Sequence, residues 1–240
     1  MNNWFVRGVL AGVRTEAPPD GDDVPRSLSP GLPKTTQLAS DEDARVLSNV
    51  CPTNAIEAAS SVACINEGRC VLCMRCSANG ALEWRHDVAW AHPTSADFSP
   101  LNQRFARSLH VRIVDAGDCG SCLNEIAQMN GPSYNLHRFG IFITPTPRQA
   151  DVLLVVGPVT QQMREALKTA YDAMPEPKRV VAVGACAASG GIFGPSFMSS
   201  GGVAEVIPVD VVVPGCPPPP HAIVDALRFV CGQSPRTERT

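Results

Sequence analysis

Val111-Arg-Ile-Val114, Val180-Val-Ala-Val183 and Val211-Val-Val213 are three short apolar runs, and cysteine follows each of them within a few residues. Runs that are rich in β-branched residues and end at Gly or Pro predict buried strands. The cysteines that follow the three runs are, in chain order, Cys119 and Cys122, Cys186, and Cys216.

A segment with helical periodicity lies between these strands. Its apolar residues are Met163, Ala166, Leu167, Ala170 and Met174. Strands that alternate with helices predict a parallel sheet with crossover connections, and such sheets bind ligands beyond the carboxyl ends of their strands. Because four thiolates hold a [4Fe-4S] cluster, the four cysteines predict one cluster at this edge of the sheet.

The composition is that of a globular chain. The 240 residues are 44% hydrophobic and carry a net charge of -3, which gives no sign of nucleic-acid binding. The sequence contains neither a G-x-G-x-x-G nor a P-loop pattern, so it does not predict a nucleotide site. The longest apolar run, Val152 to Val156, is far shorter than the ~20 residues of a membrane span. We expect no secretion signal, so the ten cysteines predict metal binding or redox chemistry rather than disulfides.

The N-terminal segment from Asn3 to Val13 is apolar with interspersed arginine. Trp4, Phe5 and Val9 would share one face of a helix, which suits a membrane surface or a partner subunit. Packing against the chain's own fold is an equally good explanation, and two glycines weaken the helix prediction. The Pro-, Asp- and Ser-rich residues 18–33 predict an extended connector.

A second cysteine group lies upstream. It consists of the run Cys70-Val-Leu-Cys73-Met-Arg-Cys76 and the earlier Cys51-Pro52. The pattern resembles that of a bacterial ferredoxin, C-x-x-C-x-x-C-x-x-x-C-P written twice, in which the fourth cysteine of each half binds the cluster of the other half. Here the first half keeps only its Cys-Pro and the second half keeps only its run. The four remaining thiols form one complete ligand set, which predicts a single [4Fe-4S] cluster.

Zinc is the main competitor for this group, because paired C-x-x-C units also build zinc sites. Three thiols at successive intervals of three residues favour a cluster. Cys64 is then surplus and is expected to be a buried apolar thiol. Cys231, in a predicted C-terminal helix that begins near Pro217 to Pro220, is expected to be structural.

In the second half of the chain, several motifs resemble the small iron–sulfur subunit shared by respiratory complex I and the energy-converting [NiFe]-hydrogenases. They are Asp118-Cys119-Gly-Ser-Cys122-Leu-Asn-Glu125, Phe139-Gly140, Pro147-Arg-Gln-Ala-Asp151, Tyr171-Asp-Ala-Met-Pro-Glu-Pro177, Gly184-Ala-Cys186 and Val209-Asp-Val-Val-Val-Pro-Gly-Cys216. The resemblance implies a flavodoxin-like domain with helices on both faces of a parallel sheet. It also implies one [4Fe-4S] cluster on Cys119, Cys122, Cys186 and Cys216, beside an active site in a larger partner.

The spacing of the first two ligands distinguishes branches of this family. Complex I subunits have adjacent cysteines, whereas Cys119-Gly-Ser-Cys122 looks like the hydrogenase branch. The stretch from Tyr171 to Pro177 looks more like complex I. The mixture resembles the membrane-bound, complex I-related hydrogenases, including formate hydrogenlyase. The N-terminal part is similar to the two-cluster ferredoxin-like subunit of those complexes. The resemblance implies that this chain is a fusion of that subunit, with only one of its clusters left, to the small subunit.

The resemblance implies an electron-transfer subunit with two [4Fe-4S] clusters. Its expected partners are a hydrogenase large subunit (or complex I D-subunit-like protein), a ferredoxin-like subunit and integral membrane subunits. It would lie in the cytoplasm, on the inner face of the cell membrane. Glu125 is a candidate for proton transfer, and the alternative is an acid in the first turn of a helix, stabilised by the helix dipole.

Two other functions remain open at this point. One is the equivalent subunit of a quinone-reducing or nickel-free complex, and the other is a free ferredoxin-like carrier or a zinc-binding module. The expected domains are an apolar segment and linker (1–33), a small ferredoxin-like α+β domain (34–90), a linker (91–110) and the large α/β domain (111–240).

Overall fold

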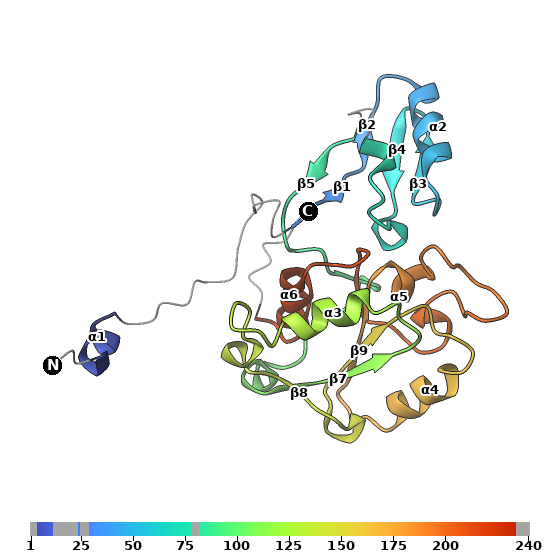
Figure 1. Ribbon diagram of the computed structural model, residues 1–240. Coiled ribbons are helices and arrows are strands. Elements are labelled where there is room, and N and C mark those ends of the chain that lie inside the picture. Colours follow the sequence, from blue (N-terminus) through green and yellow to red (C-terminus); the bar gives the residue numbers. More distant parts are fainter. Residues whose placement is uncertain (1–3, 12–23, 25–28, 78–81, 234–240) are drawn as a thin grey trace.

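The computed structural model describes residues 4–11, 24, 29–77 and 82–233. A six-stranded, mostly parallel sheet flanked by helices forms the larger part of the molecule (Figure 1). Its strands are β6 (His92–Pro93), β7 (Leu109–Asp115), β8 (Ile141–Ile143), β9 (Val152–Val156), β10 (Arg179–Val183) and β11 (Val211–Val213). Its helices are α3 (Ser121–Gln128), α4 (Arg164–Asp172), α5 (Ala185–Ser189) and α6 (Pro220–Val230). The 3-10 turns of this part are η3 (Gln103–Arg107), η4 (Leu136–Phe139), η5 (Pro147–Gln149) and η6 (Val203–Glu205).

The strands lie in the order β6-β11-β10-β9-β7-β8, and all neighbours are parallel except β6 and β11. Numbered along the chain, β7 to β11 therefore have the order 2-1-3-4-5, which is that of flavodoxin-like sheets. The three strands predicted from the valine-rich runs are present as β7, β10 and β11. The run from Val152 to Val156 forms the central strand β9.

The two faces of the sheet build two cores. Val152, Leu154 and Val156 of β9 belong to the core that α3 and α6 cover. Leu153 and Val155 point the other way, into the core that includes residues of α4, α5 and η6. All five residues of β9 are fully buried, as expected for a strand covered on both faces.

A smaller α+β unit precedes this domain. Its three-stranded antiparallel sheet has the order β2 (Thr36–Gln37), β4 (Val62–Ile65) and β3 (Ile56–Ala59), and α2 (Asp41–Val50) contacts β3 and β4. β1 (Leu32–Pro33) pairs with β5 (Trp84–Arg85), and the cysteine run begins directly after η1 (Glu67–Arg69) and ends within η2 (Arg75–Ser77). The core of this unit is small, with Leu47, Ile56, Ala63 and Leu82 at its centre.

Residues 91–110, expected to link the two parts, are closely integrated with the large domain. β6 extends the large sheet at its β11 edge, and Ala91 and Leu101 are buried in the same core as α6. Trp90, just before this segment, is 1% exposed in that core. The two parts are therefore joined by packed structure at this point.

The N-terminal segment forms the helix α1 (Trp4–Ala11), which places Trp4, Phe5 and Val9 at its surface with exposed fractions above one half. Most of the connector expected over residues 18–33 lies outside the described residues. No helix in the described ranges is long and apolar enough to span a bilayer.

Candidate metal centres

The first candidate centre lies at the carboxyl edge of the large sheet. Cys119 and Cys122 follow β7, with Cys122 in the first turn of α3, while Cys186 lies in α5 directly after β10 and Cys216 follows β11. Cys122 is buried, Cys186 is half-buried, and Cys119 and Cys216 are exposed. The parallel strands deliver these thiols to one edge because they all end there.

Two aspartates shape the loop that carries the first two cysteines. The Asp115 carboxylate accepts hydrogen bonds from the backbone N–H groups of Gly117 (2.9 Å) and Asp118 (2.7 Å). Asp118 in turn accepts from Gly120 N–H (2.9 Å) and from Leu123 N–H (3.2 Å). Leu123 lies in the first turn of α3, so the Asp118 carboxylate caps the helix that holds Cys122.

Glycines leave room for the thiols. Gly184 has φ +90°, and a Cβ at this position would lie 2.6 Å from Cys122 Sγ. Gly191 has φ +55°, and its Cβ would lie 2.9 Å from Cys186 Sγ. Any side chain at these positions would occupy space that the sulfur atoms now have, so the glycines form a cradle around them.

The four thiols lie close enough to influence one another's pKa. Burial raises the pKa of Cys122 above its ordinary range, and the charges of Asp118 and of the other three cysteines raise it further. Burial likewise raises the pKa of Cys186 to about 11, with Cys216, Cys119 and Asp118 as additional causes. The pKa of Cys216 is raised by burial, Cys119 and Asp118. Thiolates crowded in this way repel one another, and a cationic metal centre would relieve that repulsion.

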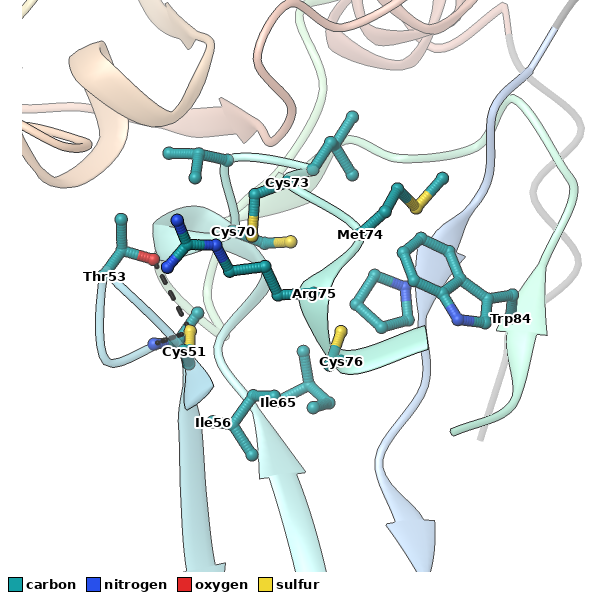
Figure 2. A pocket seen from close by; sticks show the side chains of 14 residues that line it. Cys51, Thr53, Ile56, Ile65, Cys70, Cys73, Met74, Arg75, Cys76 and Trp84 are labelled. Carbon is teal, nitrogen blue, oxygen red and sulfur yellow. Dashed lines mark hydrogen bonds between the residues drawn. The ribbon is translucent and has the colours of Figure 1, made fainter. Parts of the chain in front are cut away.

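The second candidate centre is a pocket in the small unit, shown in Figure 2. Cys51, Cys70, Cys73 and Cys76 all line it, together with apolar residues that include Ile56, Ile65 and Trp84. These are the four thiols that the ferredoxin-like spacing predicts.

Cys51 reaches this pocket from the far end of α2. It is the C-terminal cap residue of that helix, and its Sγ accepts a hydrogen bond from Ala55 N–H (3.2 Å). Cys51 therefore lies where the fourth thiol is needed. His86, which follows β5, is not among the residues that line the pocket; it lies against Gly31, where a Cβ would be 2.8 Å from the imidazole.

The thiols of this group also interact. Burial, together with the charges of Cys76, Cys51 and Cys73, raises the pKa of Cys70 to about 11. The pKa of Cys76 is raised by burial and by Cys73 and Cys51. In both candidate centres, burial and the neighbouring cysteines thus disfavour the free thiolate form.

The donor sets consist of thiols alone. All ten cysteines are free thiols, and all lie within the described ranges. A [4Fe-4S] cluster takes one thiolate on each of its four irons, and each candidate centre offers four thiols. Four cysteines are also a donor set that zinc accepts.

Three other residues with a predicted role are placed as follows. Burial raises the pKa of Glu125, which lies near Tyr134. The prediction that it stands in the first turn of its helix is wrong, because α3 begins at Ser121 and has no acidic residue in that turn. Cys64, in β4, is half-buried, whereas Cys231 is fully buried next to the end of α6.

Some supporting residues were not identified from the sequence. Asp118 stands in a quoted motif, and an Asp two residues before a glycine is typical of a helix cap or turn. Gly184 precedes Ala185-Cys186 and could have been interpreted as a position of close approach. Ser189, at the end of α5, carries no recognisable signal.

Comparison with known proteins places the chain in a family. The model of the NADH ubiquinone oxidoreductase 20 kDa subunit family matches residues 119–230. A probable membrane-bound hydrogenase subunit, mbhJ, of Pyrococcus furiosus is 46% identical over 50% of this chain and 72% of its own length. An NADH-quinone oxidoreductase subunit of Anaeromyxobacter sp. (strain K) is 40% identical over 59% of this chain and 79% of its own. Formate hydrogenlyase subunit 7 of Escherichia coli is 41% identical over 55% of this chain and about half (52%) of its own.

The family match covers most of the large domain, where the first candidate centre lies at three strand ends. The chain belongs to the NADH ubiquinone oxidoreductase 20 kDa subunit family, whose members are subunits of oxidoreductases such as hydrogenases and NADH-quinone oxidoreductases.

Proposed function

We propose that this chain is the electron-transfer iron–sulfur subunit of a membrane-associated, complex I-related [NiFe]-hydrogenase of the formate hydrogenlyase type. Residues 34–90 would form a ferredoxin-like domain with one [4Fe-4S] cluster, and residues 111–240 the small-subunit domain with a second. Residues 1–33 and 91–110 would flank and connect them. The observation that carries the proposal is that the chain holds two separate groups of four facing thiols.

Each group would bind one cluster through its four thiolates. The large-domain ligands would be Cys119, Cys122, Cys186 and Cys216, and the N-terminal ligands Cys51, Cys70, Cys73 and Cys76. A bound [4Fe-4S] cluster accepts and donates single electrons, at a potential that hydrogen bonds to sulfur and solvent exposure adjust. The Ala55 N–H donor to Cys51 Sγ would contribute to that adjustment in the N-terminal site.

An apolar surface beside the large-domain site supports a large partner subunit. The segment after Cys186 exposes Ile192 by 67%, Phe193 by 62% and Phe197 by 91%. Exposed aromatic and aliphatic side chains of this size mark interaction sites. The hydrogenase large subunit would cover this segment and the exposed Cys119 and Cys216, and so bring its own metal centre to the large-domain site. Glu125, half-buried on α3, would serve proton transfer there.

The remaining contacts of the complex would lie elsewhere on the chain. The N-terminal site would exchange electrons with a ferredoxin-like subunit. The exposed face of α1 would contact integral membrane subunits or the membrane surface, on the cytoplasmic side. Electrons would thus pass between the external ferredoxin-like subunit and the large subunit through this chain.

A complex I-like, quinone-reducing assembly is the second candidate, supported by the 40% identity to an NADH-quinone oxidoreductase subunit. Two intervening residues between Cys119 and Cys122 disfavour it, since complex I subunits have these ligands adjacent. A nickel-free relative of the hydrogenases fits the same chain. The nickel content of the partner distinguishes the hydrogenase from the other two assemblies.

The test is the iron, acid-labile sulfide and zinc content of the anaerobically purified chain and of whatever co-purifies with it. About eight irons per chain, as two four-iron cubanes require, together with nickel in a co-purifying subunit, is the expected result. Eight irons with a partner that lacks nickel would select the second candidate or its nickel-free variant. About four irons with one zinc would overturn the two-cluster relay.

A further inference from the structure

The two candidate centres approach each other where η1 of the small unit contacts α5 of the large domain. In Figure 1 the cyan loop of the small unit lies beside α5. Ser189, the last residue of α5, places its hydroxyl oxygen 3.0 Å from the Gly68 carbonyl oxygen and 3.1 Å from the Ala185 carbonyl oxygen. The hydroxyl has one proton. It therefore either alternates between the two carbonyl oxygens or shares its proton between them in a bifurcated hydrogen bond.

This hydrogen bond stands close to both ligand sets along the chain. Cys186 lies three residues before Ser189, in the same helix, and Cys70 lies two residues after Gly68. The Cys70 backbone N–H donates to the Glu67 carbonyl (3.0 Å), which closes the turn that carries Gly68. The hydrogen bond therefore joins η1, which directly precedes Cys70, to α5, which carries Cys186.

The surfaces around this bond are closely packed. Gly68 is buried, and a Cβ there would lie 3.6 Å from Ala188 Cβ and 3.4 Å from Asn66 Oδ1. On the other side of Cys70, Leu72 packs against the core that α3 and α6 cover. The cysteine run is thus held to the large domain both before and after Cys70.

A partly buried ion-pair network also holds this turn. Arg85 binds Glu67 of η1 (2.8 Å) and Asp87 (2.9 Å), and the Asp87 side chain is only 2% exposed. The Asp87 carbonyl accepts a hydrogen bond from Trp90 Nε1–H (2.8 Å), and Trp90 belongs to the large-domain core. The turn before Cys70 is therefore linked to the large domain through Arg85, Asp87 and Trp90 as well as through Ser189.

We propose that Ser189 is a positioning residue that fixes the N-terminal thiol site relative to the large-domain site, so that the small unit is a rigidly docked relay and not a swinging carrier. Its role in electron transfer rests on the proposed function. One electron would then pass between the loaded sites at a constant separation, with no bond made or broken and no proton moved. Ser189 itself neither accepts nor donates the electron.

The test compares the full-length, anaerobically purified protein with its Ser189→Ala and Ser189→Thr variants. Backbone hydrogen exchange is measured at Arg69 and Cys70, whose N–H groups close the η1 turn. In Ser189→Ala we expect exchange there to be about fivefold faster, the factor that one typical hydrogen bond gives, while β9 is unchanged. Ser189→Thr, which keeps the hydroxyl, restores the slow exchange.

A second readout is the magnetic interaction between the two reduced sites, measured by electron paramagnetic resonance. We expect one well-defined interaction in the unmodified protein and in Ser189→Thr, and a broader distribution in Ser189→Ala, with unchanged iron content. Thr169→Val is the matched control, because the Thr169 hydroxyl donates to Glu165 of its own helix (2.8 Å), in α4. It leaves both readouts unchanged.

The outcomes separate this proposal from the function on which it rests. If Ser189→Ala changes neither readout while iron stays at about eight per chain, Ser189 does not fix the joint and the proposal is overturned. If the unmodified protein holds iron for one cluster only, the relay fails, but the exchange comparison at Arg69 and Cys70 still upholds or overturns the positioning role of Ser189.

Discussion

The two thiol sites are built in opposite ways. Three of the four N-terminal cysteines lie within residues 70–76, in a unit whose core has four buried apolar residues at its centre. The large-domain cysteines are spread over residues 119–216 and meet because three parallel strands end at one edge. The first site is local in sequence and the second is a product of the sheet.

Because of this difference, the two sites are held in place by different interactions. The large sheet is covered on both faces by extensive apolar cores, so it can hold its thiols in place before any cluster binds. The small unit has too few buried side chains to be stable by packing alone, and a bound cluster would contribute directly to its folding. Ligand removal, metal removal and substitutions near one site should therefore affect the two parts unequally.

The largest effect is expected from removing one ligand of either site. Cys70→Ser and Cys186→Ser should each keep about four of the eight irons that two cubanes hold, because the two ligand sets share no residue. Iron and acid-labile sulfide analysis of the purified variants measures this. Cys64→Ser, at a half-buried thiol that lines neither site, should keep all the iron. Loss of all iron from either ligand variant would contradict two independent sites.

Removal of iron by an anaerobic chelator should unfold one region and not the other. Without metal, Cys51 at the end of α2 loses its link to Cys70, Cys73 and Cys76, and the small core does not compensate. We expect amides of β3 and β4 to lose their protection from hydrogen exchange, while those of β9 and β10 keep it. Equal loss of protection in both regions would show that the large sheet also depends on metal.

Gly184→Ala should damage the large-domain site alone. The new Cβ would lie 2.6 Å from Cys122 Sγ, on a backbone with φ +90°. We expect a loss of about 2–4 kcal/mol in the free energy of unfolding, from strain and overpacking, and about half of the iron. The measurements are denaturant unfolding of the large domain and iron content.

Gly194→Ala is the control for this variant. Gly194 also has a positive φ (+60°), but a Cβ there meets nothing within 4 Å. It should cost about 1 kcal/mol by backbone strain and leave the iron content unchanged. If both variants behaved alike, backbone strain and not crowding of the thiol would explain the effect of Gly184→Ala.

The smallest effect is expected from the cap of α3. Asp118→Ala removes the carboxylate that accepts from Gly120 and Leu123, and should lower the stability of the large domain by about 1 kcal/mol. Asp118→Asn keeps an acceptor oxygen and should recover most of it. Thermal unfolding followed by circular dichroism measures both, and the N-terminal iron should not change. An equal loss in Asp118→Asn and Asp118→Ala would argue that the charge of Asp118 matters more than its acceptor oxygen.

Much of the fold could be predicted because its signals are local. The runs before Cys119, Cys186 and Cys216 are β-branched and end at Gly or Pro, and such runs form buried strands in nearly any α/β context. The periodicity from Met163 to Met174 likewise predicted α4, which spans Arg164–Asp172. Buried β9 was noticed only as an apolar run, since its length alone does not distinguish a strand from a helix segment.

The other differences come from contacts between distant residues. Residues 91–110 have the prolines and polar residues of a linker, yet β6 pairs with β11 across more than 100 residues of chain. Glu125 was expected in the first turn of its helix, but Asp118 and Gly120 allow α3 to begin at Ser121. The pairing of two distant strands cannot be predicted from the sequence of one segment. The same holds for a helix start that is set by hydrogen bonds from a neighbouring loop.

By itself, the sequence predicts which thiols form each group, because ligand spacing and strand ends can be identified along the chain. The tertiary structure decided how the groups relate to their surroundings: Gly184 beside Cys122, Cys51 beside the run from Cys70, and Ser189 on Gly68. These contacts join residues that are far apart in sequence, and only the packing of the sheet, α5 and the small unit brings them together.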